Sequence, residues 1–162
     1  DAYGACWLVK QVKMADNATA ALLAIGSTNL KDPAIVEGTA AASITQPQWD
    51  ATASIRLVKF DNDQIDYESN AAAPQFAVFS EMYYPAGWNA YIDGKPATYF
   101  KTDYALRGIQ VPAGKHAIRF VFEPSTFRKG VNISFAASFA ILIALVGGLF
   151  MAWKQGNKKT AK

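Results

Sequence analysis

The sequence has little of the side chains on which many catalytic and metal sites depend. It holds one cysteine, Cys6, and one histidine, His116, among 162 residues. A single cysteine cannot form an internal disulfide, and one cysteine with one histidine is too few ligands for a His/Cys zinc site. A Ser-His-Asp triad would have to use His116, and no serine lies in a nucleophile-elbow pattern. We therefore expect no catalytic residue, no metal site and no cofactor, with His116 an exposed or packing side chain.

Basic charge is scarce in the first 127 residues. The chain holds 16 Lys and Arg against 13 Asp and Glu, a formal net charge of +3. Residues 1–127 contain all 13 acids but only ten of the bases, so this part carries a net −3. Proteins that bind nucleic acid usually carry a basic stripe, which this part lacks. We therefore expect no nucleic-acid partner.

Long apolar runs are also rare, and the exception lies near the C-terminus. Residues 131–153 are 23 residues without a charge. A helix rises about 1.5 Å per residue, so this run can cross a hydrocarbon core of about 30 Å. The alternative is a buried core helix, but the length and the flanking bases favour a lipid bilayer. These bases are Arg128, Lys129, Lys154, Lys158, Lys159 and Lys162.

Charge also predicts the orientation of this span. Excess Lys and Arg remain in the cytoplasm, and four of the six flanking bases follow the span. We expect an extracytoplasmic β-sandwich-like domain in residues 1–127, a transmembrane helix in 128–154 and a basic cytoplasmic tail in 155–162. Small exported domains of eukaryotes are usually stapled by disulfides, so the single cysteine, expected to be buried, favours a bacterial envelope protein.

The N-terminus and the apolar run together favour a multi-pass parent protein. The chain starts at Asp1 without an initiator Met or an export signal, so a removed signal peptide or earlier spans must export residues 1–127. Small residues recur every four positions in the run and so form one stripe, although alanine is also common elsewhere in the chain. Such a stripe lets other transmembrane helices approach closely. Its members are Ala136, Ala140, Ala144 and Gly148, with Ala152 in the same register.

The part before the span is predicted to be mostly β, an antiparallel β-sandwich with one short helix. Short apolar or alternating segments with turns between them indicate such a fold. The helix is expected at 17–25, capped by Asp16 and closed by Gly26. Residues 38–51 look like a surface connection. Strands are expected at 7–14, 34–37, 54–60, 64–68, 76–83, 89–92, 97–101, 106–111 and 116–123.

Two turns and one acidic cluster have specific signatures. Asp93-Gly94 suits a type I′ hairpin, and Pro112-Ala113-Gly114 suits a type I turn. The acids of residues 61–68 suggest calcium, but an EF-hand loop from Asp61 needs Gly at its sixth position and Glu at its twelfth. The sequence has Asp66 and Ala72 there. A solvated turn is the better interpretation.

An aromatic cluster in residues 83–104 is the candidate binding feature. Tyr and Trp combine an apolar body with a polar tip, and their faces can stack on sugars or lie at a membrane interface. The alternative is that these side chains form the core of the sandwich. The candidate residues for contact with a sugar or lipid carrier are Trp88 first, then Tyr83, Tyr84 and Tyr91.

The same region resembles the YfhO family of bacterial multi-pass membrane proteins. The resemblance lies in residues 79–95 (FSEMYYPAGWNAYIDGK), 106–116 (LRGIQVPAGKH) and 122–124 (FEP), followed by a closing transmembrane helix. It implies a parent in the bacterial inner membrane with many preceding spans, similar to GT-C glycosyltransferases that use polyprenyl-phosphate sugars. The catalytic acid of that architecture lies in an N-terminal outer loop, so no catalytic residue is carried over to this chain.

Three functions follow as alternatives. The chain is the C-terminal accessory extracytoplasmic domain and last span of a glycosyltransferase-like protein that transfers polyprenyl-linked sugars to cell-envelope glycans. Alternatively, it is a noncatalytic carbohydrate-binding domain, or a structural domain that stabilises the transmembrane bundle. The expected partners are the lipid bilayer, other helices of the parent, and an envelope glycan or polyprenyl-phosphate sugar.

Overall fold

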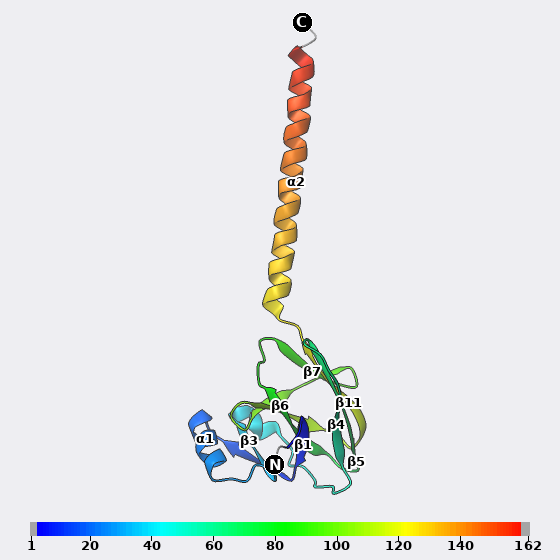
Figure 1. Cartoon of the computed structure of the whole chain (residues 1–162). Helices are drawn as coiled ribbons and strands as arrows, with labels where there is room; N and C mark the ends of the chain where they lie inside the picture. The colour runs from blue at the N-terminus through cyan, green and yellow to red at the C-terminus, as the bar shows by residue number, and fades with distance from the viewer. Residues whose placement is uncertain (1–2, 160–162) are drawn as a thin grey trace. The chain divides into compact units, whose positions relative to one another are not determined.

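The computed structural model describes residues 3–159, and their side chains except those of residues 40–41, 125–129 and 152–159. It forms two compact units, Asp1–Glu123 and Pro124–Lys162. The first is a β-sandwich with one short α-helix, and the second is a long apolar helix (Figure 1). The predicted fold class is confirmed. The domain boundaries expected after residues 127 and 154 stay predictions.

The sandwich consists of a six-stranded and a five-stranded sheet. Their strand orders are β1-β6-β10-β9-β3-β2 and β4-β5-β11-β7-β8. Among the described ladders only β2 with β3 is parallel. The strands are β1 Cys6–Val9, β2 Gln11–Ala15, β3 Pro33–Glu37, β4 Ser54–Phe60, β5 Gln64–Ala71, β6 Gln75–Met82, β7 Trp88–Ile92, β8 Lys95–Ala97, β9 Tyr99–Thr102, β10 Leu106–Val111 and β11 Gly114–Phe122.

The first predicted strand, 7–14, is wrong because the chain divides at Lys10. β1 and β2 lie at opposite edges of the larger sheet. The backbone N–H groups of Lys10 and Gln11 both donate to the carbonyl of Asp32, at 2.8 and 3.3 Å, which fixes the change of direction. Cys6 in β1 is half-buried against the core, and this burial raises the pKa of its thiol to about 11.

The short helix α1 (Ala18–Gly26) starts one residue later than predicted. Asn17, not Asp16, is its N-cap, and the Asn17 Oδ1 accepts a hydrogen bond from the Ala20 N–H at 2.9 Å. Gly26 is the last helical residue rather than the residue after the helix. The helix packs Ala21 against Ile35 of β3. Because Ile35 faces away from Ala34 and Val36, α1 covers β3 on one face only.

One predicted turn stays within a sheet, whereas two other connections carry the chain between the sheets. Asp93 and Gly94 have φ angles of 50° and 76°, as the predicted type I′ turn requires. The strand expected at 97–101 is instead divided: β8 belongs to the smaller sheet and β9 to the larger. Likewise the turn at residues 112–114 connects strands of different sheets, so β10 and β11 do not pair.

The connection at 38–51 covers part of the larger sheet and includes the 3-10 helix η1 (Thr39–Ser43). The Gln46 side chain pairs with the backbone of Val12 in the edge strand β2: its Oε1 accepts from the N–H at 2.9 Å and its Nε2 donates to the carbonyl at 2.8 Å. β3 lies between β9 and β2, so Pro33 marks a strand start and not an edge.

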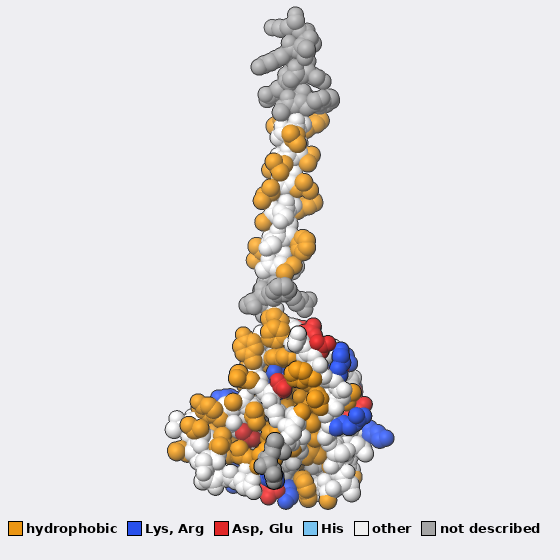
Figure 2. All heavy atoms as spheres, in the orientation of Figure 1, with side chains coloured by type: hydrophobic (Ala, Val, Ile, Leu, Met, Phe, Trp, Pro, Cys, Tyr) orange, Lys and Arg blue, Asp and Glu red, His pale blue; other side chains and the backbone are white. Residues whose placement is uncertain are grey.

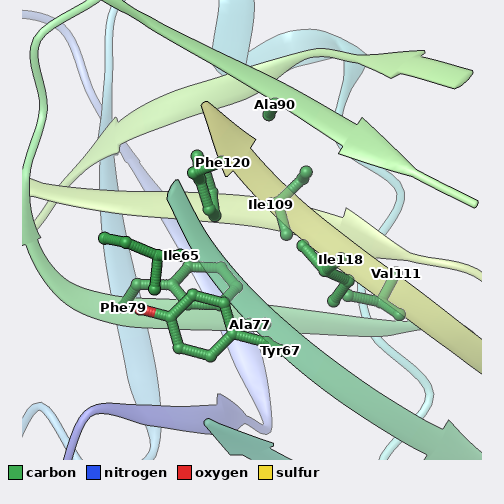
Figure 3. Close-up of a cluster of buried hydrophobic side chains, with 9 residues drawn as sticks. All are labelled: Ile65, Tyr67, Ala77, Phe79, Ala90, Ile109, Val111, Ile118 and Phe120. Atoms are coloured by element: carbon green, nitrogen blue, oxygen red, sulfur yellow. The ribbon is translucent and has the colours of Figure 1, made fainter. Parts of the chain in front are cut away.

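The main core lies between the two sheets. Figure 3 shows that the Tyr67 ring of β5 meets the Phe79 ring of β6, with ring centroids 4.6 Å apart. Phe120 of β11 packs against both rings. A second core lies on the opposite face of the larger sheet, where Phe76 and Phe100 pack with Ile44 of the 38–51 connection. The larger sheet is therefore buried on both faces.

The second unit is helix α2 (Ser125–Lys159). Its stretch Gly130–Met151 has a mean hydropathy of 2.3 and is long enough to cross a membrane. Ala136, Ala140, Ala144 and Gly148 are exposed in it. The flanking basic side chains and Ala152 lie outside the described side chains.

Candidate functional site

The outer face of the smaller sheet is hollowed. One hollow of ≈ 540 Å³ lies over β5, β11 and β7, and a second of ≈ 430 Å³ continues from it past Glu68 and Ala117. Both lie in the volume range of about 300–1,000 Å³ that is usual for ligand pockets. We call the two together the outer groove. Its polar and aromatic lining includes Arg56, Asp66, Glu68, Tyr91, Asp93, Lys115, His116, Arg119 and Glu123.

Strand alternation places these side chains. In β11, Ile118 and Phe120 are fully buried in the core, so Arg119 between them faces outward. In β5 the same alternation buries Ile65 and Tyr67 and turns Asp66 outward. Asp66 and Arg119 are directly paired in the ladder of these two strands. The groove floor is thus built on rigid backbone, with its charges fixed by the sheet.

A charged pair forms the centre of the groove. The Arg119 Nε donates to the Asp66 Oδ1 at 2.7 Å, and the Gln64 Nε2 donates to the Asp66 Oδ2 at 2.8 Å. Partial burial alone would raise the pKa of Asp66, but these hydrogen bonds and the positive charge of Arg119 outweigh it and lower the pKa. Asp66 is therefore an ionised acceptor at neutral pH.

Tyr91 forms one wall of the groove. Its hydroxyl and the Asn89 Nδ2 both donate to the Glu123 Oε2, each at 3.1 Å. The hydrogen bond to Glu123 raises the pKa of Tyr91, because it stabilises the neutral phenol. The carboxylate therefore holds the Tyr91 side chain at the side of the hollow that it lines.

His116 lines the second hollow and is hydrogen-bonded to Asp93, which lines the first. Its Nδ1 lies 2.6 Å from the Asp93 Oδ2, and its Nε2 lies 3.0 Å from the Ala113 carbonyl. The hydrogen bond with Asp93, then that with the carbonyl, raises the pKa of His116, while the His116 bond lowers the pKa of Asp93. Asp93 also accepts from the Ala117 N–H at 2.9 Å. His116 thus connects the turn at Asp93 to the turn at Ala113 through its two ring nitrogens.

The four candidate aromatic residues do not form one site. Trp88 and Tyr91 lie three residues apart in β7 and so face opposite sides of the sheet. Trp88 packs on Phe122 at the end of the sandwich, with ring centroids 5.3 Å apart. Tyr83 contacts Tyr99, and Tyr84 is half-exposed in the turn after β6. Tyr91 alone lines the outer groove, and contact of any of the four with a ligand stays a prediction.

A buried arginine explains the position of Trp88. Arg107 is 2 % exposed, and its guanidinium lies 4.4 Å from the Trp88 ring centroid and 5.1 Å from that of Phe120. Its Nε donates to the Met82 carbonyl at 2.8 Å, whereas Nη1 has no hydrogen-bond partner. Burial lowers the pKa of Arg107, and the two aromatic faces compensate part of the lost hydration. Trp88 is therefore engaged in packing.

Sequence reasoning found the groove residues only in part. Tyr91 is a candidate from the sequence, and Asp66 and Glu68 belong to its acidic cluster. Alternation also places Arg119 and Glu123 together on the face opposite Ile118, but nothing in the sequence brings that face beside Tyr91 and Asp66. The outward alternation of residues 117–123 was the available signal. Among residues 3–159, no three His, Cys, Asp or Glu side chains are grouped so that they could hold a metal ion.

Comparison with known protein families gives one match. A family model described as bacterial membrane protein YfhO matches residues 15–134, which include β3 to β11 and the start of α2. No curated protein matches the chain. No solved structure matches it either.

Proposed function

Because the chain belongs to the YfhO family of bacterial membrane proteins, we propose that residues 1–127 are an extracytoplasmic accessory domain that binds a glycan in the outer groove. The longer membrane protein then takes part in polyprenyl-linked sugar transfer to cell-envelope glycans, and this part is not itself catalytic. A noncatalytic domain of this kind presents the acceptor glycan and leaves the chemistry to other parts of the protein.

The observation that carries this proposal is the combination of an aromatic wall with fixed charges in one open groove. Sugars present hydroxyls, which both donate and accept hydrogen bonds, and apolar ring faces, which stack on aromatic side chains. Asp66 supplies an ionised acceptor and Arg119 supplies further N–H donors. Tyr91 supplies the stacking face beside them. Little reorganisation is needed on binding, because all three lie on paired strands.

The location of the domain follows from the charge around the span. The bases after residue 153 favour a cytoplasmic C-terminus in the bacterial inner membrane, with the sandwich on the other side. The small-residue stripe Ala136, Ala140, Ala144 and Gly148 would receive neighbouring helices of the parent. A Cβ added at Gly148 meets no atom within 4 Å in this chain. Loss of parent stability in Gly148→Leu would therefore report a partner helix rather than a clash within α2.

A binding experiment with matched tyrosines tests the glycan proposal. The full chain, reconstituted in lipid nanodiscs, is applied to an array of bacterial envelope oligosaccharides, and the strongest binder is titrated by calorimetry. Tyr91→Ala should weaken binding by about five- to twelvefold, the loss of one stacking contact worth roughly 1–1.5 kcal/mol. Tyr3→Ala is the control, since Tyr3 is also exposed but lies outside the groove.

Two outcomes would contradict the proposal. Equal weakening by the two variants, or weakening by Tyr3→Ala alone, would move the site away from the outer groove. Absence of binding to every oligosaccharide would favour the structural alternative, in which the domain only stabilises the transmembrane bundle.

A further inference from the structure

One end of the sandwich is apolar and exposed. Phe60 is 60 % exposed, Met82 72 %, Tyr84 51 % and Phe122 38 %. Figure 2 shows hydrophobic side chains gathered on the sandwich at the end where the chain leaves β11. We call these four residues the apolar end. Side chains of this size are exposed in a group there, whereas a soluble domain usually scatters them.

Hydrogen bonds hold these residues together at one end. The Phe122 N–H donates to the Asp63 carbonyl at 2.8 Å, which joins the end of β11 to the turn after Phe60. The Glu123 N–H donates to the Gly87 carbonyl at 2.7 Å, which joins it to the turn that carries Tyr84. Phe122 also packs closely over Gly87, where an added Cβ would lie 2.2 Å from its ring. The apolar end is therefore part of the fold.

The chain itself limits how far this end can be from lipid. Helix α2 begins at Ser125, and its candidate membrane span begins at Gly130. Three extended steps and five helical steps allow a Cα separation between Phe122 and Gly130 of at most roughly 18 Å. This limit holds for any orientation of the two units. An interfacial layer of a bilayer is about 5–8 Å thick, so the apolar end is tethered within reach of this layer.

We propose that the apolar end inserts into the interfacial layer of the bilayer and holds the sandwich against the membrane surface. Tyr is suited to this layer, where its ring meets lipid and its hydroxyl meets water, while Phe and Met add apolar surface that lipid can cover. Among the described side chains, the charges beside the apolar end are mainly acidic, with Asp61, Asp63 and Glu123 there and Lys59 paired to Asp61. The contact is therefore driven by apolar burial and does not require anionic lipid.

The membrane contact of the apolar end does not require a bound glycan, but it would fix the distance of the outer groove from the lipid. β11 contributes Arg119 to the groove floor and ends at Phe122. With Phe122 in the interfacial layer of the bilayer, the outer groove would be held at a fixed height above the lipid. A glycan attached to a lipid carrier would then meet the groove at a defined distance from its anchor.

Depth-dependent quenching tests the proposal on the full chain. In a Cys6→Ala background, a single cysteine is introduced by Tyr84→Cys or Met82→Cys and labelled with an environment-sensitive fluorophore. Ala72→Cys is the matched control, because Ala72 is exposed in the turn at the opposite end of β5. Each protein is reconstituted in phosphatidylcholine vesicles with or without a phosphatidylcholine that bears a nitroxide near its headgroup.

Labels at 82 and 84 should be quenched several-fold more strongly than the label at 72, at all protein-to-lipid ratios. Equal quenching at the three positions would overturn the proposal. So would quenching that disappears on dilution of protein in the vesicles, which indicates a second copy of the chain, or quenching that needs anionic lipid. The Tyr91→Ala binding assay is unaffected by these results, so the two proposals fail separately.

Discussion

The two sheets of the sandwich differ in how many of their faces are covered. In the larger sheet, β6 buries Phe79 toward the other sheet and Phe76 on the opposite side. In the smaller sheet, β5 buries Tyr67 inward, but Asp66 on its other face lines an open groove. The larger sheet thus takes part in both cores, whereas the smaller sheet contributes only its inner face to a core. Its outer face is where a ligand can bind without disturbing the fold.

The largest effects should come from truncations on the two faces of β6. Phe76→Ala and Phe79→Ala should each lower the free energy of unfolding by about 3–5 kcal/mol, because both rings are fully buried. Val58→Ala, on the exposed strand β4 in the outer groove, should cost roughly 0.5 kcal/mol or less. Denaturant unfolding of the full chain in detergent, followed by near-ultraviolet circular dichroism, measures all three. A Phe76→Ala cost as small as that of Val58→Ala would show that the larger sheet has only one covered face.

A close approach within the larger sheet should give the next effect. A Cβ added at Gly108 would lie 2.3 Å from the Thr102 Oγ1 and 2.6 Å from the Phe76 ring. Gly108→Ala should therefore destabilise the sandwich by about 1–3 kcal/mol, the usual cost of overpacking. Gly147→Ala in α2, where an added Cβ meets nothing within 4 Å, is the control in the same unfolding assay. A neutral Gly108→Ala would mean that β9 and β10 separate easily.

A buried carboxyl in the turn after β9 should make stability depend on pH. Burial raises the pKa of Asp103 to about 6, although a hydrogen bond from the Ile35 N–H to its Oδ1 opposes the shift. The folded state therefore keeps the proton longer than the unfolded chain, and stability should fall as the pH rises from about 4 to about 6. Asp103→Asn keeps the acceptor oxygen and tolerates the positive φ of 48°.

The expected result is a gain for Asp103→Asn on the order of 1–2 kcal/mol at pH 7. At pH 4 the two proteins should differ much less, because Asp103 is then protonated in the folded state and about half protonated in the unfolded chain. Thermal unfolding from pH 4 to pH 8 measures the difference. Parallel curves for the two proteins would show that Asp103 is not the group that titrates.

Local sequence signals predicted most of the strands, the short helix and one turn of the fold, and pairing partners decided the rest. The Asp93-Gly94 turn was predicted correctly because its signal is confined to two residues with positive φ. The division of the chain at Lys10 could not be predicted, because it depends on Asp32 and on which edges of the sheet are vacant. For the same reason the turn at residues 112–114 gave no sign that it joins different sheets.

The candidate site shows the same limit. Alternation along β7 already separates Trp88 from Tyr91, so the sequence could have excluded a shared site for the two. The charged pair of Asp66 and Arg119 joins residues 53 positions apart, and only the register of β5 with β11 brings them together. A single sequence carries no signal for that register.

The smallest predicted effect concerns two tyrosine hydroxyls on opposite sides of the smaller sheet. The Tyr91 hydroxyl donates to Glu123 in the exposed groove, so Tyr91→Phe should change the free energy of unfolding by no more than about 0.5 kcal/mol. The Tyr99 hydroxyl donates to the Trp88 carbonyl at 2.9 Å inside the sandwich, so Tyr99→Phe leaves that acceptor unpaired and should cost about 1–2 kcal/mol. Both variants are measured by the same denaturant unfolding. If Tyr91→Phe costs as much as Tyr99→Phe, the groove wall supports the fold, and the outer face of the smaller sheet is not free for a ligand after all.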